Sequence, residues 1–309
     1  MSNLTLQAGL TAVITGAGSG FGLELARLAA KKGLKLVLTD VQQDALDAAV
    51  AELEGAGAEV AALRGDVSRA EDVQALADLC MERFGAPHIV VNNAGVAHGG
   101  LIWEHTQRDW EWVLGVNLFG VIHGVRIFTP LMLAAAQKDP KWQGHIVNVA
   151  SMAGLLNSPN MGAYNVSKHA VVSLSETLYQ DLSLVTEQVH ASVLCPYFVP
   201  TGIHLSHRNR PAELRSEGEP TPSQMIAQAM STKAVTSGKV TAADTAALVY
   251  DAIESGKFYI YTHPQALGMV QTRLEDVVQG RNPTDPFAGK PEIGQQLRQA
   301  LREAMAKQG

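Results

Sequence analysis

The sequence has few cysteines, few aromatic residues and no excess of basic charge. Only Cys80 and Cys195 occur among the 309 residues, which excludes a disulfide framework and offers no zinc-binding spacing. Lys and Arg number 24 against 30 Asp and Glu, so non-specific binding to nucleic acid or to an anionic membrane is disfavoured. Hydrophobic residues make up 46% and charged residues 17% of the chain. This balance excludes intrinsic disorder and predicts a folded core.

Features of targeting or membrane-spanning segments are also missing. The first seven residues show no basic region followed by an apolar core. The longest apolar helical stretch, near residues 112–136, is interrupted by Asn117, His123, Arg126 and Pro130. It falls short of the roughly 18 consecutive apolar residues that a spanning helix needs. We therefore expect a soluble, cytoplasmic protein.

Short apolar runs alternate with longer amphipathic segments along most of the chain. The expected strands are residues 11–15, 34–39, 60–63, 89–91, 145–149, 190–194 and 258–261. The expected helices between them are residues 23–32, 42–54, 71–84, 110–136, 163–187 and 241–255. This order predicts a Rossmann-type, doubly wound parallel sheet of seven strands with helices on both faces. Such sheets bind ligands at the carboxyl ends of their strands.

Two regions fall outside the alternation. Residues 202–240 show no clear period and are long for a connection, so we expect a functional lid over the substrate. Residues 263–309 follow the last strand, with helical pieces near 265–278 and 292–306. We predict one domain over residues 1–262, including the lid. The extension over residues 263–309 would pack on this domain or at an oligomer interface.

A glycine-rich loop, TGAGSGFG from Thr15 to Gly22, lies between the first expected strand and helix. Glycines let a backbone turn sharply and approach a pyrophosphate, and the helix N-terminus offers free N–H groups. A tight turn that binds nothing could have the same composition. The position between a strand and a helix favours a dinucleotide site.

Asp40 ends the second expected strand, 18 residues beyond Gly22. A carboxylate there can accept hydrogen bonds from ribose hydroxyls and repels a 2′-phosphate. Neither Ser19 nor Val41 supplies a cation that would offset this repulsion. We expect NAD rather than NADP, and a solvated strand-end carboxylate is the alternative.

Tyr164 and Lys168 lie four residues apart on one face of an expected helix. A phenol with its ordinary pKa of about 10 is a poor base at neutral pH. A neighbouring ammonium would lower that pKa and allow proton exchange with a substrate oxygen. The pair indicates catalysis only together with other motifs, because Tyr and Lys often lie one helical turn apart.

Those motifs resemble, in order and spacing, the classical short-chain dehydrogenase/reductase family. The glycine loop is similar to the family's TGxxxGxG, and residues 92–95 read NNAG, as in the family. Tyr164 and Lys168 match YxxxK, and Ser151 precedes Tyr164 by 13 residues, as the family's serine does. Further matches are the helix asparagine and the PGxVxT stretch, at Asn117, Pro196, Val199 and Thr201.

The resemblance implies hydride transfer between nicotinamide C4 and a secondary alcohol or ketone. It implies that Tyr164 is the general acid/base, that Ser151 binds the substrate oxygen, that Lys168 binds the nicotinamide ribose and that Asn117 holds a water. Because Ser151 and Tyr164 polarise the substrate oxygen, we expect no metal. The implied cofactor contacts are Gly16, Ser19, Gly20, Phe21, Gly22, Asp40, Asp66, Val67, Asn93, Ala94, Gly95, Tyr164, Lys168, Pro196, Val199 and Thr201.

Substrate contacts are less defined. Tyr197 stands where the family has glycine, so it either narrows the pocket or packs against the lid. His98 follows the NNAG motif, where the family's substrate cleft lies, and is a candidate substrate contact together with Ser151 and Tyr164. The long lid predicts a bulky, mostly apolar secondary alcohol or ketone.

The lid arginines Arg208, Arg210 and Arg215 are interleaved with Glu213, Glu217 and Glu219. We expect them to form a solvated segment rather than an anion site.

Two other functions are compatible with the motifs: an NADPH-dependent carbonyl reductase, and a non-catalytic dinucleotide-binding sensor or scaffold. Family members commonly pair through the two long helices, here about 109–136 and 160–187, and through the last strand. We therefore expect a homotetramer or a homodimer.

Overall fold

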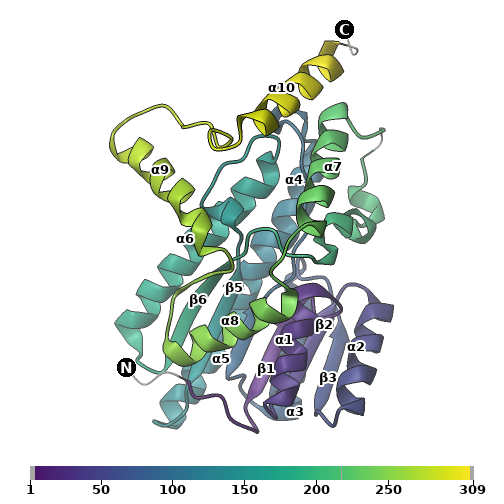
Figure 1. The fold of residues 1–309 in the computed structure, drawn as a ribbon. Coiled ribbons are helices and arrows are strands. Elements are labelled where there is room, and N and C mark those ends of the chain that lie inside the picture. Colours follow the sequence, from purple (N-terminus) through teal and green to yellow (C-terminus); the bar gives the residue numbers. More distant parts are fainter. Residues whose placement is uncertain (1–3, 217, 307–309) are drawn as a thin grey trace.

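The computed structural model describes residues 4–216 and 218–306, which form a seven-stranded, fully parallel sheet (Figure 1). The strand order is β3-β2-β1-β4-β5-β6-β7. The strands are β1 (Thr11–Thr15), β2 (Lys35–Asp40), β3 (Val60–Arg64), β4 (Ile89–Asn92), β5 (Gly144–Val149), β6 (Val189–Cys195) and β7 (Tyr259–Tyr261). The prediction of a doubly wound parallel sheet is confirmed.

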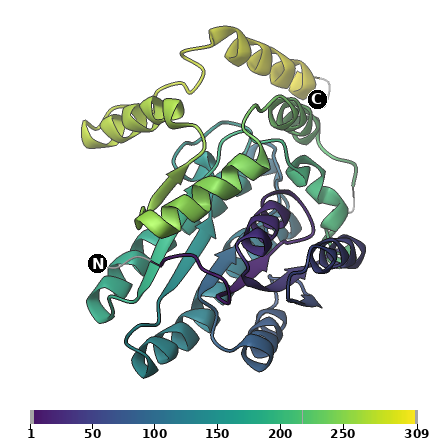
Figure 2. The same ribbon diagram turned by 60° about the horizontal axis from the view of Figure 1, so that its bottom comes forward.

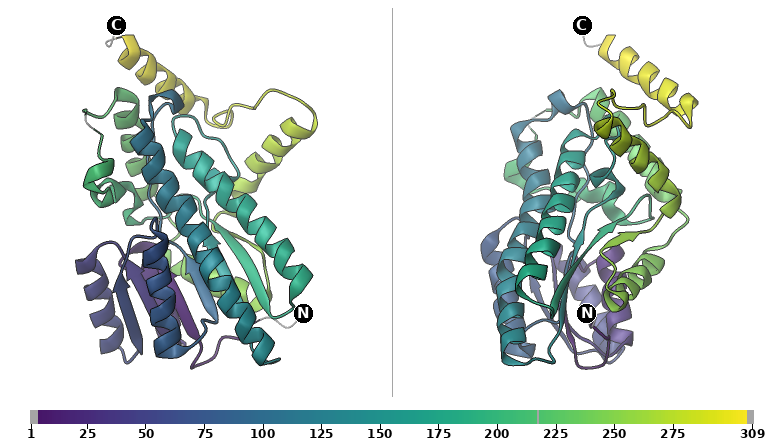
Figure 3. Two further views of the ribbon diagram at one scale, coloured as in Figure 1. Left: turned by 180° about the vertical axis from the view of Figure 1, so that it is seen from behind. Right: turned by 90° about the vertical axis from the view of Figure 1, so that its left-hand side faces the viewer.

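Helices cover both faces of this sheet, as the two views in Figure 3 show. One face carries α1 (Gly20–Lys31), α2 (Gln43–Gly55) and α8 (Ala242–Ser255). The other carries α3 (Ala70–Phe84), α5 (Gly120–Lys138) and α6 (Gly162–Val185). Each face therefore has its own apolar core, and the strands between them are buried on both sides, which explains their nearly continuous apolar sequences.

The helix predicted over residues 110–136 is divided into two. Helix α4 (Gln107–Leu114) begins at Thr106, whose side chain forms a capping box with Asp109. A π-helical turn, η2 (Gly115–Phe119), then leads into α5, and Gly120 donates its N–H to Gly115 five residues earlier. By length and composition alone, Gln107–Lys138 is apolar enough to cross a membrane. In this fold its buried side chains, such as Phe128 and Met132, pack against the sheet.

The lid contains more regular structure than its sequence suggests. It holds the short helices η4 (Gly202–Asn209) and η5 (Ala212–Leu214) and a full helix, α7 (Pro222–Thr236). Helix α7 was not predicted. Its start is nevertheless marked in the sequence, because Thr221 forms a capping box with Gln224 and Pro222 occupies the first turn.

The C-terminal extension consists mainly of α9 (Leu267–Val278) and α10 (Pro291–Ala306), close to the predicted positions. Figure 2 shows both helices on the same side of the molecule as the lid, beyond the sheet. Helix α10 packs against α7. The extension therefore contacts the lid of the same chain.

Candidate active site

The glycine loop leaves the N-terminus of α1 open towards a groove. No side chain caps this helix, so its first N–H groups are available to a ligand. Gly22 is required for close packing, because a Cβ there would lie 2.1 Å from the carbonyl oxygen of Gly16. The side chain of Asn93, just after β4, donates to the carbonyl oxygens of Thr15 at 2.8 Å and Gly16 at 3.2 Å. The end of β4 thus fixes the shape of the loop.

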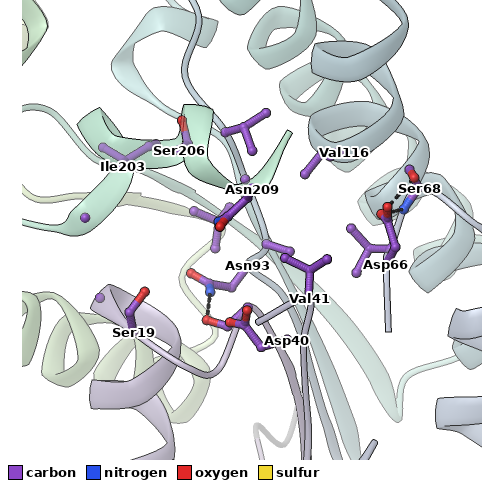
Figure 4. A pocket seen from close by; sticks show the side chains of 18 of the residues that line it. Ser19, Asp40, Val41, Asp66, Ser68, Asn93, Val116, Ile203, Ser206 and Asn209 are labelled. Carbon is purple, nitrogen blue, oxygen red and sulfur yellow. Dashed lines mark hydrogen bonds between the residues drawn. The ribbon is translucent and has the colours of Figure 1, made fainter. Parts of the chain in front are cut away.

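Asp40 holds the same loop from the other side. Its Oδ2 accepts from the N–H of Gly18 at 2.9 Å, and its Oδ1 accepts from the N–H of Gln42, also at 2.9 Å. The carboxylate is therefore part of the groove wall, not a solvated strand end. Figure 4 shows Asp40 and Asn93 on one side of the groove, with Ile203, Ser206 and Asn209 of the lid on the other.

The groove runs along the carboxyl ends of the central strands from Asp40 to Lys168. The predicted cofactor contacts that line it are Gly16, Ser19, Gly20, Phe21, Asp40, Asp66, Val67, Asn93, Ala94, Gly95, Tyr164, Lys168, Pro196 and Thr201. Gly22 and Val199 do not line it. Residues that the sequence did not indicate complete the walls, among them Thr39, Glu111, Trp112, Ile203, Ser206, Arg208, Asn209 and Leu214. Glycines at close approaches, an acidic strand end and an open helix N-terminus fit a dinucleotide.

Tyr164 and Lys168 line one end of the groove, and Ser151, which does not line it, lies beside Tyr164. Tyr164 and Lys168 lie in the first two turns of α6, with Lys168 Nζ 5.8 Å from the centre of the Tyr164 ring. Nζ also donates to the carbonyl oxygen of Val149 at the end of β5, at 2.9 Å. Ser151 follows β5 and shares a hydrogen bond with Tyr164. The fold therefore brings Ser151 beside Tyr164 and Lys168, which follow it by 13 and 17 residues.

Burial dominates the protonation of this group. It raises the pKa of Tyr164, and the hydrogen bond with Ser151 acts in the opposite direction. Burial also lowers the pKa of Lys168 to about 8. A lowering of the Tyr164 pKa by Lys168 is not seen in this structure, where the loss of hydration of the phenolate is the largest cause of the shift.

Asn117 lies in the π-helical turn and is fully buried. Its amide exchanges two hydrogen bonds with the backbone of Val96, at 2.8 and 2.9 Å, and donates to Ser167 Oγ at 3.1 Å. A Cβ on Gly95 would lie 3.4 Å from Asn117 Oδ1 and 3.6 Å from Lys168 Nζ. Asn117 is thus near Lys168, and its side chain joins α6 to the segment after β4.

His98 does not line the groove. Its Nε2 lies 3.2 Å from Oδ1 of the fully buried Asp109. His98, His105 and Asp109 place potential metal-binding atoms within 4.8 Å of one another. Arg210 Nη1 lies 2.6 Å from the same Asp109 oxygen and already supplies a positive charge there. The expectation that Arg210 belongs to a solvated segment is therefore wrong.

Tyr197 also lies outside the groove. Its ring contacts Phe198, with centroids 4.2 Å apart, and His263, at 5.8 Å. Tyr197 therefore packs against Phe198 and the segment after β7.

Comparisons with known proteins agree with this geometry. The sequence model of a family described as short chain dehydrogenase matches residues 10–211. A CLA biosynthesis dehydrogenase/reductase of Lactiplantibacillus plantarum is 34% identical over 270 residues, 86% of this chain and 92% of that protein. The C alpha-dehydrogenase of Sphingobium sp. strain SYK-6 is 31% identical over 291 residues, 94% of this chain and 91% of that protein.

A solved structure is similar over nearly its whole length. It is a short chain dehydrogenase/reductase from Burkholderia phymatum in complex with NAD. The two chains are 53% identical, with a TM-score of 0.89 over 92% of this chain and 99% of the other.

Proposed function

Since the chain belongs to the short-chain dehydrogenase/reductase family and is an oxidoreductase of hydroxyl groups, we propose that it oxidises a secondary alcohol, or reduces the ketone, with NAD. Tyr164 is the general acid/base of this proposal. The observation that carries it is the position of Tyr164 and Lys168 at the end of the groove that begins at Asp40, with Ser151 beside Tyr164.

Each of the four predicted catalytic residues has a role in this proposal. The Ser151 hydroxyl, fixed by the N–H of Ala153 at 3.1 Å, holds the substrate oxygen beside Tyr164. Tyr164 takes the hydroxyl proton of the alcohol during oxidation and returns it during reduction. Lys168 binds the nicotinamide ribose with its ammonium group, and Asn117 positions a water beside Lys168. The nicotinamide ring of bound NAD supplies the hydride acceptor at C4.

A raised pKa of Tyr164 favours the reduction of the ketone over the oxidation of the alcohol. A protonated phenol is the acid that ketone reduction requires, and burial keeps Tyr164 protonated. Oxidation requires the phenolate, which burial disfavours. The pH dependence of the two directions should therefore differ.

Asp40 supports NAD as the cofactor. Both carboxylate oxygens are fixed by backbone N–H groups, so the negative charge cannot turn away from a 2′-phosphate. The NAD bound to the similar protein of Burkholderia phymatum points the same way.

The remaining parts of the proposal concern substrate, assembly and location. Apolar lid residues support a bulky, mostly apolar substrate, and exposed apolar side chains on α6, such as Leu184 and Val185, support pairing into a homodimer or homotetramer. Residues 1–262 would be the catalytic domain with its lid at 202–240, residues 263–309 its extension, and the cytoplasm its location. Sedimentation velocity and cell fractionation test assembly and location.

The experiment that tests the function is a panel of secondary alcohols and ketones assayed with NAD(H) and with NADP(H), for wild type and Tyr164→Phe. We expect turnover with NAD and a loss in Tyr164→Phe of about 100-fold or more, with NADH binding retained. A preference for NADPH would support the carbonyl reductase instead. Binding without turnover of any substrate, and a cellular effect that Tyr164→Phe leaves unchanged, would support the scaffold.

A further inference from the structure

We propose that Arg208 of the lid binds the diphosphate of the dinucleotide. The inference rests on the proposed function, because it takes NAD as the ligand. It assigns to the lid a direct role in cofactor binding, in addition to covering the substrate.

The charges along the groove favour such a cation. Its walls carry the carboxylates of Asp40, Asp66 and Glu111, and a diphosphate brings two further negative charges. Among the residues that the structure describes, the cations that line it are Lys168 and Arg208. Lys168 is buried at the opposite end and donates to Val149. Arg208 is therefore the cation that remains for the diphosphate.

Arg208 lies next to the place where the diphosphate would bind. A Cβ on Gly202 would be 3.6 Å from Arg208 Nη2, so the guanidinium adjoins the turn at Thr201 and Gly202. A Cβ on Gly20, the first residue of α1, would be 3.3 Å from Thr201 Cβ. The guanidinium thus stands across this turn from the open N-terminus of α1, where anions are favoured.

The lid backbone is fixed on both sides of Arg208. Ser206 Oγ accepts from the N–H of Ala97 at 2.9 Å and donates to the carbonyl oxygen of Ala97 at 3.1 Å. Two residues beyond Arg208, Arg210 is ion-paired with Asp109. These anchors hold the short helix η4 across the groove, so ordering Arg208 on a ligand costs little backbone entropy.

Arg208 is also available. Within residues 4–216 and 218–306 its exposed side chain makes no ion pair or hydrogen bond, whereas Arg210 is used by Asp109. An arginine fork can bind two phosphate oxygens at once, which lysine cannot do in the same geometry.

Binding measurements on four proteins test this role: wild type, Arg208→Ala, Arg208→Lys and Arg215→Ala. Arg215 is a matched control, since it is an exposed lid arginine that does not line the groove. NADH binding is followed by fluorescence titration, and binding of ADP-ribose and adenosine by calorimetry, at low and high NaCl. ADP-ribose carries the diphosphate and adenosine lacks it.

We expect Arg208→Ala to raise the Kd for NADH and ADP-ribose about tenfold and to leave adenosine binding unchanged. Arg208→Lys should lie between, and Arg215→Ala should match wild type. Added salt should weaken binding to wild type more than binding to Arg208→Ala, because an exposed charge is screened.

Equal Kd values of wild type and Arg208→Ala for NADH and ADP-ribose would overturn this inference and leave the proposed function standing. An equal loss of adenosine binding would also overturn it, because the diphosphate would not be what Arg208 recognises. Binding of neither NADH nor NADPH to wild type would overturn the proposed function as well.

Discussion

Arg210 and Asp109 form a buried ion pair that joins the lid to helix α4. Arg210 Nη1 lies 2.6 Å from Asp109 Oδ1, and the Asp109 side chain is fully buried. Arg210 also covers the Trp112 ring at 5.0 Å. Burial by itself raises the pKa of Asp109, but hydrogen bonds from His98, Thr106 and Arg210 hold it well below its usual value. The carboxylate is therefore charged in the folded protein and depends on its partners.

Replacing Arg210 by methionine should destabilise the protein, because it leaves a buried carboxylate without its cation. We expect a loss of about 3–5 kcal/mol in the free energy of unfolding at pH 7. Adding Asp109→Asn should recover part of this loss, since the amide is neutral.

The same pair predicts a pH dependence. A carboxyl group whose folded pKa is depressed contributes stability above its unfolded pKa of about 4 and loses it as the pH falls below that value. Urea unfolding of both proteins at pH 7 and pH 3 measures this, and the gap between wild type and Arg210→Met should shrink at pH 3. A loss below about 1 kcal/mol at pH 7, the range of exposed pairs, would contradict the role given to the pair.

Gly22→Ala should disrupt the glycine loop. The added Cβ would lie 2.1 Å from the Gly16 carbonyl oxygen, so backbone must shift at the open end of α1. We expect NADH affinity to fall at least about tenfold and stability to fall by about 1–3 kcal/mol. Gly268→Ala in α9 is the control, because among the described residues its added Cβ would meet nothing within 4 Å beyond its chain neighbours and its own helix backbone. Fluorescence titration and thermal unfolding that found both variants alike would refute this explanation.

Asp40→Asn should weaken the preference for NAD over NADP. The amide keeps an acceptor oxygen for a backbone N–H but removes the charge that faces a 2′-phosphate. At 4–6 Å in partly hydrated surroundings such a charge is worth about 1–3 kcal/mol, so the ratio of kcat/KM values should fall about tenfold or more. Asp44→Asn, an exposed change of equal charge in the first turn of α2, should leave the ratio unchanged. An equal fall of this ratio in both variants would mean that the net charge of the protein, not the position of Asp40, sets the cofactor preference.

Lys168→Met should abolish turnover and stabilise the protein at neutral pH. Burial lowers the pKa of Lys168 from 10.5 to about 8, so the folded protein holds this proton at a cost at pH 7. Methionine removes that cost, offset by the lost hydrogen bond to Val149, for a net gain of about 1–3 kcal/mol.

The direction of the pH effect follows from linkage. Between about pH 8 and 10.5 the unfolded chain binds more protons at Lys168 than the folded one, so wild-type stability rises relative to the variant. Urea unfolding at pH 7 and pH 10 should show the variant's advantage shrinking at the higher pH. An advantage that is absent at pH 7, or that grows with pH, would contradict the assignment.

The sequence predicted the sheet well because its strands are buried on both faces. Such strands need nearly continuous apolar residues, and β1 matches its predicted range at both ends. Helix α7 was missed because its apolar residues, including Met225, Ile226 and Met230, do not follow one face, and only Ser223, Ala227 and Val235 are buried. The capping box at Thr221 was the available signal.

The glycine loop, Asp40 and the Tyr164–Lys168 pair could be predicted because each is a local pattern with its own chemistry. The lid contacts could not. Arg210 meets Asp109 across 101 residues, and alternating charges in a sequence do not show which member becomes buried. The upward direction of the Tyr164 pKa also depends on burial, which spacing along a helix does not reveal.

The π-helical turn at Gly115–Phe119 rotates the side chains that follow it about the helix axis, relative to those that precede it. Its extra residue puts the side chains of α4 out of phase with those of α5. Asp109 and Trp112 can therefore turn towards the lid while Phe128 and Met132 turn towards the sheet. One continuous run of helix thus contacts the lid through α4 and the sheet through α5, each with a differently oriented face.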